Sequence, residues 1–364
     1  MSAAEGLLIR GLTAAFGKRE VLRGVDLAVA PGETVVLFGP SGVGKTVLLR
    51  AVAGLERAGG EVSVAGREVS GLPPEARGLG MAFQNFALYP HLPARENIAS
   101  PLRARRLPEA EIARRVGAIA ALLRIGHVLD HAPRELSNGQ KQRTALARAL
   151  AAEPRALLLD DPLRNVDAKL RYEMRLELPR LLARSGAAAI YVTQDYREAM
   201  ALGQRVAVLL DGRIVQDAPP EEVYDQPATV EVARLFGDPP INLLSAESLP
   251  GGRLRAAGLE VPLPDSLRAL PPDAQLGLRP EHLSLLPSPA PGAAPASVVA
   301  VTPLHERQVV LLRTASGEEL VASLAGAAPP VGAAVWAAAE PGHALLFAGG
   351  QRIAHGAGRE VAAA

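Results

Sequence analysis

The chain has 364 residues, of which 48% are hydrophobic, and its formal net charge is +1. This length and hydrophobic content are sufficient for a substantial core and predict two domains. The balanced charge gives no indication of a nucleic acid or other polyanionic partner. The sequence contains no Cys, which excludes disulfides and Cys-ligated zinc and suits a reducing compartment.

Features of exported or membrane-spanning chains are not apparent in the sequence. The segment from Met1 to Gly6 lacks a basic stretch followed by an apolar one, so we expect no export signal. No apolar run reaches the roughly 18 residues of a spanning helix, so we expect none. Any role at a membrane would then depend on partner proteins.

Short strands are predicted near the N-terminus, where residues from about Leu7 to Val29 alternate between apolar and polar. Phe16 lies in a turn of this region. Its ring could stack on an adenine base, and the alternative is ordinary packing in the core.

A Gly-rich turn between a strand and a helix is the central motif of the sequence. Glu33–Phe38 is predicted to be a buried strand, and Val47–Val52 has apolar residues at helical spacing. The turn follows the pattern G-x-x-x-x-G-K-[ST] and consists of Gly39, Pro40, Ser41, Gly42, Val43, Gly44, Lys45 and Thr46. Backbone N–H groups of such a turn, together with the helix N-terminus, cradle nucleotide phosphates. We therefore expect Lys45 to reach the β- and γ-phosphates and the Thr46 hydroxyl to bind Mg²⁺.

Further strands and helices alternate after this motif. Gly80–Gln84 is predicted to be a strand that ends in a polar residue, and Glu109–Ile125 has the apolar spacing of a helix. Ala156–Asp160 is an apolar run that delivers a carboxylate at its end, and Ala187–Thr193 is a second buried strand. Such strands fit the centre of a parallel sheet, which binds ligands at its carboxyl edge. We therefore predict an α/β core.

The pattern changes after Asp238, where short strands broken by Gly and Pro replace the helices. Their spacing predicts a small β-barrel-like domain. The expected domains are 1–238, with a helical subdomain at about 86–155, and 239–364.

Six ordered motifs together resemble those of an ATP-binding cassette (ABC) ATPase, and more narrowly those of the ATPase subunit of bacterial carbohydrate importers of the maltose-importer type. They are the phosphate loop at Gly39–Thr46, the glutamine loop at Gln84, the signature at Leu136–Gln140, the Walker B strand at Leu157–Asp160, the D-loop at Arg164–Asp167 and the switch segment at Tyr191–Asp195. Gly277–Leu283 is also similar to a stretch of the C-terminal oligonucleotide-fold-like (TOBE) domain in this branch. The resemblance implies a P-loop ABC domain with a helical subdomain, followed by an all-β TOBE domain.

The resemblance also implies the cofactors, ATP and Mg²⁺, and a head-to-tail dimer. In such a dimer each nucleotide lies between the phosphate loop of one cassette and the signature of the other. The residues with implied roles are Ser137, Asn138, Gly139 and Gln140 on the partner's γ-phosphate, Gln84 and Asp160 at Mg²⁺, and Asp161, Gln194 and Gln84 around the attacking water.

The implied partners are two membrane-spanning permease subunits, a second ABC ATPase and, indirectly, a periplasmic or lipid-anchored substrate-binding protein; no nucleic acid is implied. The chain would be peripheral to the cytoplasmic face of the bacterial inner membrane. The segment Phe86–His91 would contact a membrane subunit, unless it serves internal packing. The expected cargo is a carbohydrate or polyol, with polyamine, iron or sulfate as alternatives.

Two departures from the family pattern affect residues that are expected to take part in ATP hydrolysis. Asp161 stands where the family has Glu, so its carboxylate is roughly 1.5 Å short, and an offset near 1 Å can cost about a hundredfold in rate. Gln194 replaces a His and cannot become cationic. Milder departures are Asn138 for Gly, Val47 for a hydroxyl residue near the α-phosphate, and Arg164 for Ser.

These departures favour a site that binds ATP and hydrolyses it poorly. The chain would then pair with a standard ATPase, to which it would supply its signature. The alternative is a homodimeric, competent ATPase in which the departures are neutral. A cassette protein of DNA repair or translation is disfavoured, because the chain has one cassette, no heptad run and no Cys.

Overall fold

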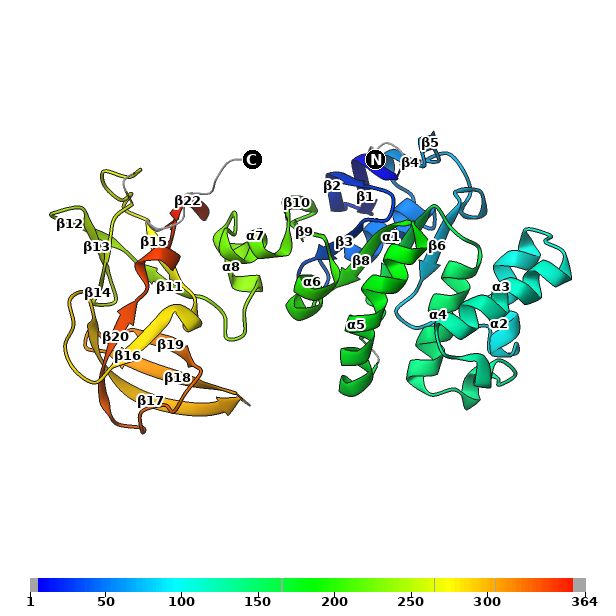
Figure 1. The fold of residues 1–364 in the computed structure, drawn as a ribbon. Helices are drawn as coiled ribbons and strands as arrows, with labels where there is room; N and C mark the ends of the chain where they lie inside the picture. Colours follow the sequence, from blue (N-terminus) through cyan, green and yellow to red (C-terminus); the bar gives the residue numbers. More distant parts are fainter. Residues whose placement is uncertain (1–5, 165, 265, 305, 356–364) are drawn as a thin grey trace. The chain divides into compact units, whose positions relative to one another are not determined.

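The computed structural model describes residues 6–164, 166–264, 266–304 and 306–355. The chain divides into two compact units, Met1–Pro220 and Glu221–Ala364 (Figure 1). Asn165, which belongs to the expected D-loop, lies outside the described residues.

The first unit begins with an antiparallel sheet, as the alternating pattern predicted. Its strand order is β2 (Arg19–Val29), β1 (Leu7–Phe16), β4 (Gly59–Val64) and β5 (Arg67–Glu68). The apolar faces of β1, β2 and β4 pack into one core together with the central sheet and helix α1 (Lys45–Ala53).

The central sheet has the strand order β10-β9-β3-β8-β7-β6. Its strands are β6 (Leu79–Ala82), β7 (Ala156–Asp160), β8 (Ala188–Thr193), β3 (Thr34–Phe38), β9 (Arg205–Leu210) and β10 (Arg213–Ala218). Every residue of β3, β7 and β8 is buried, as expected for a parallel sheet covered on both faces. The five strands from β6 to β9 are parallel, which confirms the predicted α/β core.

Strand β10 is antiparallel to its neighbour β9. The two strands are joined by Asp211 and Gly212, whose φ angles are 45° and 75°. Two consecutive residues with positive φ match a tight hairpin turn, so the chain reverses there instead of crossing over.

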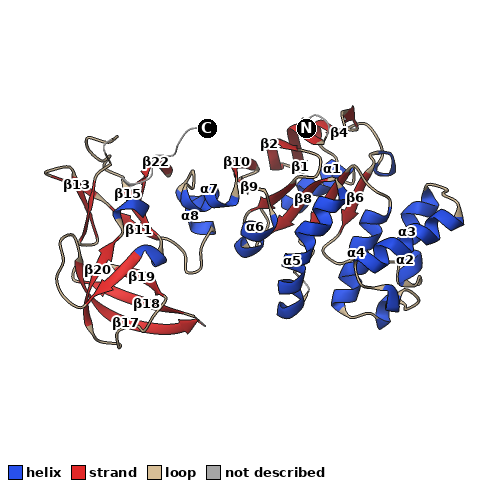
Figure 2. Ribbon diagram, in the orientation of Figure 1, coloured by secondary structure: helices blue, strands red, loops and turns tan. Residues whose placement is uncertain are grey.

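Helices α2 (Ala94–Ala104), α3 (Glu109–Leu122) and α4 (Asn138–Ala151) contact one another and form the helical part of this unit (Figure 2). Helix α3 buries Ile112, Val116 and Ala120, the face that the periodicity predicted. It ends before the expected Ile125, because Arg124 has a φ of 55°, which stops a right-handed helix. Short 3₁₀ turns η2 (Pro74–Ala76), η3 (Gly126–Val128) and η4 (Pro133–Glu135) occur in the connections.

Helices α5 (Ala168–Ser185) and α6 (Tyr196–Leu202) follow β7 and β8, respectively, along the chain. Within the described residues, no helix has the length and hydrophobicity that crossing a bilayer requires.

The second unit starts within the short helix α7 (Pro220–Asp225), and the short helix α8 (Val230–Leu235) follows. The buried Arg279 donates to the carbonyl of Phe236 at 2.6 Å and lies over the ring of Tyr224 at 3.5 Å. The amide of Val230 donates to the carbonyl of Gly350 at 2.9 Å. These contacts attach both helices to the strands that follow. The first compact unit therefore ends at Pro220, before the expected domain boundary at 238, and that boundary stays a prediction.

The rest of the second unit is built of strands, as predicted. They are β11 (Asn242–Ser245), β12 (Glu247–Leu249), β13 (Arg253–Ala256), β14 (Leu259–Pro262), β15 (Gln275–Leu278), β16 (Leu283–Leu286), β17 (Ala294–Leu304), β18 (Arg307–Thr314), β19 (Glu319–Leu324), β20 (Ala334–Ala339), β21 (Leu345–Ala348) and β22 (Gln351–His355). The described strands form three antiparallel sheets, of orders β11-β15-β21-β22, β12-β13-β14 and β16-β20-β17-β18-β19. One apolar core joins the three sheets.

Candidate functional site

A cavity of about 390 Å³ opens at the carboxyl ends of β3, β7 and β8. Most of the residues that the sequence singled out line it. They are Phe16, Ser41, Gly42, Gly44, Lys45, Thr46, Val47, Gln84, Asp160, Asp161 and Gln194. The structure therefore brings together side chains from five separate segments of the chain.

The turn between β3 and α1 depends on glycines at two close approaches. A Cβ atom on Gly39 would lie 2.4 Å from the carbonyl oxygen of Leu209. Gly44, with a φ of 114°, is the N-cap of α1, and a Cβ there would lie 2.9 Å from Val21 Cγ1. Having no side chain, Gly44 cannot cap the first-turn amides of α1, which leaves them directed at the cavity end of the helix. Gly39, Pro40 and Val43 belong to this turn but do not line the cavity.

The ammonium of Lys45 is held by the turn itself. Its Nζ donates to the carbonyls of Gly39 at 2.6 Å and Pro40 at 2.7 Å. Burial lowers the pKa of Lys45, and the carboxylates of Asp161 and Asp160 act in the opposite direction. The cation is thus fixed over the Gly-rich turn, beside two carboxylates.

Thr46 and Asp160 form an oxygen pair at the base of the cavity. The hydroxyl of Thr46 donates to Oδ1 of Asp160 at 3.0 Å. Burial raises the pKa of Asp160, and the hydrogen bond from Thr46 partly offsets this effect. Hydroxyl and carboxylate oxygens are ligands that suit Mg²⁺, and the adjacent N–H groups and Lys45 suit phosphates. The residues present therefore fit Mg-ATP.

Asp161 sits directly after β7 in a strained backbone conformation, with a φ of 44°. Its amide donates to the carbonyl of Val192 at 3.0 Å, which holds it against β8. Burial, together with the nearby Glu198, raises the pKa of Asp161 to about 6 against the opposing effect of Arg164. Nη1 of Arg164 lies 3.8 Å from Oδ2 of Asp161.

Four cavity residues had no assigned role in the sequence: Arg19, Val21, Arg164 and Val192. Arg164 was noted only as a departure from the D-loop pattern, and its i, i+3 spacing from Asp161 was the signal that it faces this carboxylate. Glu198 was not noted at all. It is buried and accepts hydrogen bonds from the hydroxyls of Tyr191 and Thr193, both at 2.9 Å.

Phe16, Val47, Gln84 and Gln194 also lie in the cavity wall. The side chain of Phe16 is 50% exposed, so core packing does not account for its position. This exposure supports its expected contact with an adenine ring. The roles of all four residues stay predictions.

The signature residues do not line this cavity. Ser137 is the N-cap of α4, and its hydroxyl accepts from the amide of Gln140 at 3.2 Å. The side chain of Gln140 accepts from the Ser137 amide at 2.9 Å, which completes a capping box. Ser137 and Asn138 are exposed and Gly139 is buried, so the N-terminus of α4 is available to another molecule.

Comparison with known proteins agrees with both parts of this picture. A family model described as ABC transporter matches residues 22–164, and one described as TOBE domain matches residues 276–347. The sn-glycerol-3-phosphate import ATP-binding protein UgpC of Cereibacter sphaeroides is 46% identical over 88% of this chain and 91% of its own length. The chain belongs to the ABC transporter ATPases.

Another relative and a solved structure extend the comparison. The UgpC protein of Rhizobium meliloti is 44% identical over 85% of this chain and 88% of its own length. The dimeric ATP-binding cassette MJ0796, bound to ADP and phosphate, is similar with a TM-score of 0.53 and 29% identity, over 59% of this chain and 98% of that one. The expected family, its P-loop and TOBE folds, and its cofactors ATP and Mg²⁺ are thereby confirmed.

Proposed function

We propose that this chain is the ATP-binding subunit of an importer for sn-glycerol 3-phosphate or a closely related polyol or sugar phosphate. The observation that carries the proposal is the near full-length similarity to UgpC proteins, which extends beyond the cassette. Reconstitution with the permease and binding protein of the same importer tests it. We expect glycerol 3-phosphate, and not maltose, to stimulate ATP hydrolysis, and stimulation by maltose alone would contradict the cargo assignment.

The nucleotide cavity performs the binding part of this function. Lys45 and the amides of the Gly-rich turn hold phosphate oxygens, and Thr46 with Asp160 holds Mg²⁺. Bound Mg-ATP would supply the γ-phosphoryl group, and the transfer of this group to water would drive transport. The exposed ring of Phe16 orients the base at the other side of the cavity.

We further propose that this chain hydrolyses ATP slowly in its own cavity. The carboxylate of Asp161 is shorter than the usual Glu, and the guanidinium of Arg164 competes for it at 3.8 Å. Gln194 can donate a hydrogen bond to a phosphate oxygen but supplies no positive charge. Water positioning and charge stabilisation are therefore both weakened, while the binding contacts remain.

A second ATPase completes the sites in this proposal. The signature at the N-terminus of α4 does not line the chain's own cavity, so it acts on a nucleotide held by a partner. The dimeric state of MJ0796 supports such pairing. A standard ATPase with Glu and His at the two altered positions would then carry the hydrolysis. The competing reading is a homodimer in which Asp161 is the working base.

The remaining partners are two permease subunits and, through them, a substrate-binding protein. The chain acts as a peripheral subunit at the cytoplasmic face of the inner membrane. Tyr89, which is 46% exposed, lies at the edge of a groove of about 640 Å³ between the glutamine loop and the helical part. We propose that this groove receives a permease helix.

A further inference from the structure

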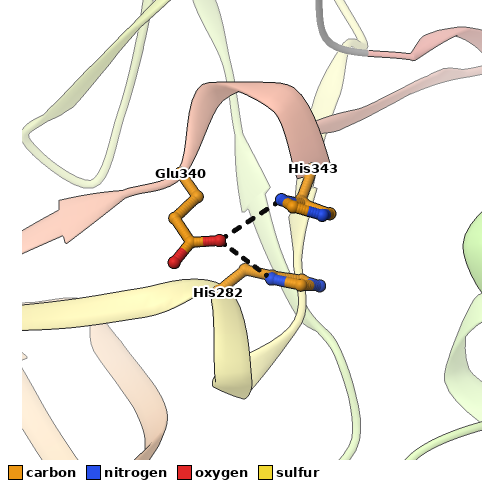
Figure 3. A group of neighbouring side chains, drawn as sticks. All are labelled: His282, Glu340 and His343. Atoms are coloured by element: carbon orange, nitrogen blue, oxygen red, sulfur yellow. Dashed lines mark hydrogen bonds and ion pairs between the residues drawn. The ribbon is translucent and has the colours of Figure 1, made fainter. Parts of the chain in front are cut away.

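Two imidazoles and a carboxylate meet in the second unit, outside the nucleotide site (Figure 3). His282 ends the 3₁₀ turn η5 (Pro280–His282), Glu340 follows β20, and His343 ends η6 (Pro341–His343). The Nδ1 atoms of His282 and His343 lie 3.2 and 3.3 Å from the same oxygen, Oε2 of Glu340. Among the described residues this is a group of three side chains able to share one metal ion.

The backbone fixes the positions of the three residues. Strands β16 and β20 pair with Leu283 opposite Ala339, so the next residues outward are His282 and Glu340. The amide of Glu340 donates to the carbonyl of His282 at 3.1 Å, which extends the ladder by one bond. The amide of His343 donates to the carbonyl of Glu340 at 3.1 Å. The three residues thus lie at the end of a sheet and in a tight turn. These are rigid backbone elements of the kind that a binding site requires.

The side chains themselves are arranged with one edge toward a common point. The two imidazole rings stack with centroids 3.8 Å apart and planes 7° from parallel, and both Nδ1 edges face Glu340. With metal–ligand bonds of about 2.0–2.2 Å, neighbouring ligand atoms of a tetrahedral Zn²⁺ site lie about 3.3 Å apart. The observed separations of 3.2 and 3.3 Å match this spacing.

We propose that His282, Glu340 and His343 bind one divalent transition-metal ion, and that Zn²⁺ is a suitable ion. Two imidazole nitrogens and one carboxylate oxygen are an established ligand set for Zn²⁺, with water in the remaining position. Mg²⁺ and Ca²⁺ are disfavoured because they prefer oxygen ligands. The parallel rings turn about their Cβ–Cγ bonds to aim both nitrogens at one ion, and the 39% exposure of the His343 side chain leaves room for this turn.

The ion would cross-link two segments of the second unit. It would join η5, at the start of β16, to η6, which connects β20 with β21. A ligand that binds the folded state and not the unfolded chain stabilises the fold by an amount that grows with the logarithm of the ratio of its concentration to its dissociation constant. Metal binding is therefore expected to stabilise this unit without a contact to the nucleotide cavity residues.

Calorimetric titration of ZnCl₂ into the full-length chain, produced without a polyhistidine tag and stripped of metal, tests the proposal. We expect one high-affinity Zn²⁺ per chain. His343→Ala should weaken binding by at least about a hundredfold, because losing even a residue that merely orients a ligand costs roughly 10- to 100-fold. Glu340→Gln, which keeps the shape and removes the charge, should also weaken it. His127→Ala, at an exposed histidine in η3, is the matched control and should bind as the parent does.

Thermal unfolding provides a second readout for the same variants. Zn²⁺ should raise the melting temperature of the parent and of His127→Ala, but not that of His343→Ala, and Mg²⁺ at equal concentration should have no such effect in the absence of nucleotide. If His343→Ala does not fold, His343→Asn takes its place with the same expectation. Zn²⁺ binding that is equally tight in the His343 variant and the parent would overturn the proposal, as would an absence of binding to the parent. Zn²⁺ held by Asp160 and Asp161 would give the first of these results.

Discussion

Asp161 combines a short side chain, a strained backbone and a cationic neighbour at the position where we propose that hydrolysis is weakened. Its φ of 44° and its amide bond to Val192 fix the direction of the side chain. The guanidinium of Arg164 lies 3.8 Å from the carboxylate and attracts it electrostatically. Because both features affect the direction of the carboxylate, a longer side chain at this position should restore part of the rate of ATP hydrolysis.

We predict that, in the complex with a partner ATPase whose own site is inactivated, Asp161→Glu combined with Gln194→His raises ATP hydrolysis by about a hundredfold. The magnitude corresponds to removing an offset of about 1 Å at the reacting centre. Phosphate release at saturating Mg-ATP measures it, and Asp130→Glu, a matched change at an exposed aspartate that does not line the cavity, serves as the control. An unchanged rate in the double variant, with normal ATP binding, would show that neither residue limits hydrolysis.

Lys45 is the residue on which nucleotide affinity should depend most. Its ammonium is buried and held by the carbonyls of Gly39 and Pro40. We predict that Lys45→Ala removes most of the affinity for Mg-ATP, because a fixed positive charge next to the phosphates is lost. Calorimetry measures the affinity, and Lys169→Ala, at an exposed lysine, is the control. Equal affinity in Lys45→Ala and the parent would be incompatible with the assigned site.

At this scale the motif residues were predictable from the sequence and their contacts were not. Spacing alone placed Lys45, Thr46 and Asp160 at one sheet edge, where the structure has them. The approach of Arg164 to Asp161 was missed although their i, i+3 spacing was a local signal, because Arg164 was considered only as a departure from the D-loop pattern. The buried Glu198 was missed because it lies in α6, after the end of the switch segment that contains its partners Tyr191 and Thr193.

Among the elements, the segment after Gln84 has an unusual local structure. Phe86 and Ala87 have φ angles of 63° and 47°, and the guanidinium of Arg148 donates to both carbonyls, at 3.0 and 2.6 Å. Strained backbone held by an outside side chain is common at functional sites. Helix α4 thus carries both the signature at its start and, at Arg148, the support of the proposed permease groove.

We predict that Tyr89→Glu releases the chain from its permease while Mg-ATP binding persists. Tyr89 is 46% exposed at the edge of the groove, so a charge there opposes docking of an apolar helix without disturbing a core. Co-sedimentation with permease-containing membranes measures attachment, and Tyr172→Glu, at an exposed tyrosine of α5, is the control. Continued membrane attachment of a folded Tyr89→Glu protein would exclude the groove as the docking site.

Elements with strong periodicity were predicted well, and their ends and connections were predicted poorly. Helix α3 was found from its apolar face, yet it ends at Leu122 because of the backbone at Arg124. The antiparallel direction of β10 follows from the turn at Asp211–Gly212, a feature that hydrophobic patterns do not report.

For the whole molecule, the sequence predicted two units and the family, and the comparisons confirm the family. The position at which the first unit ends was harder to predict from the sequence. The hydrophobic pattern of helices α7 and α8 is like that of the preceding helices. Only long-range contacts, such as those of Arg279 with Phe236 and Tyr224, attach them to the second unit. Contacts between residues distant in sequence cannot be read from local composition.

We propose that this chain binds ATP in its own cavity and serves a partner's hydrolysis through its signature. In the complete importer with its native partner ATPase, Asp161→Asn should change transport little. Ser137→Arg should reduce transport by about a hundredfold or more, because a bulky cation would replace the contact to the partner's γ-phosphate.

Uptake of glycerol 3-phosphate by vesicles carrying each assembled variant is the most direct measurement. We expect near-normal uptake with Asp161→Asn and almost none with Ser137→Arg. Equal loss of uptake in the two variants, with normal assembly, would contradict it and identify Asp161 as the working base of a competent site.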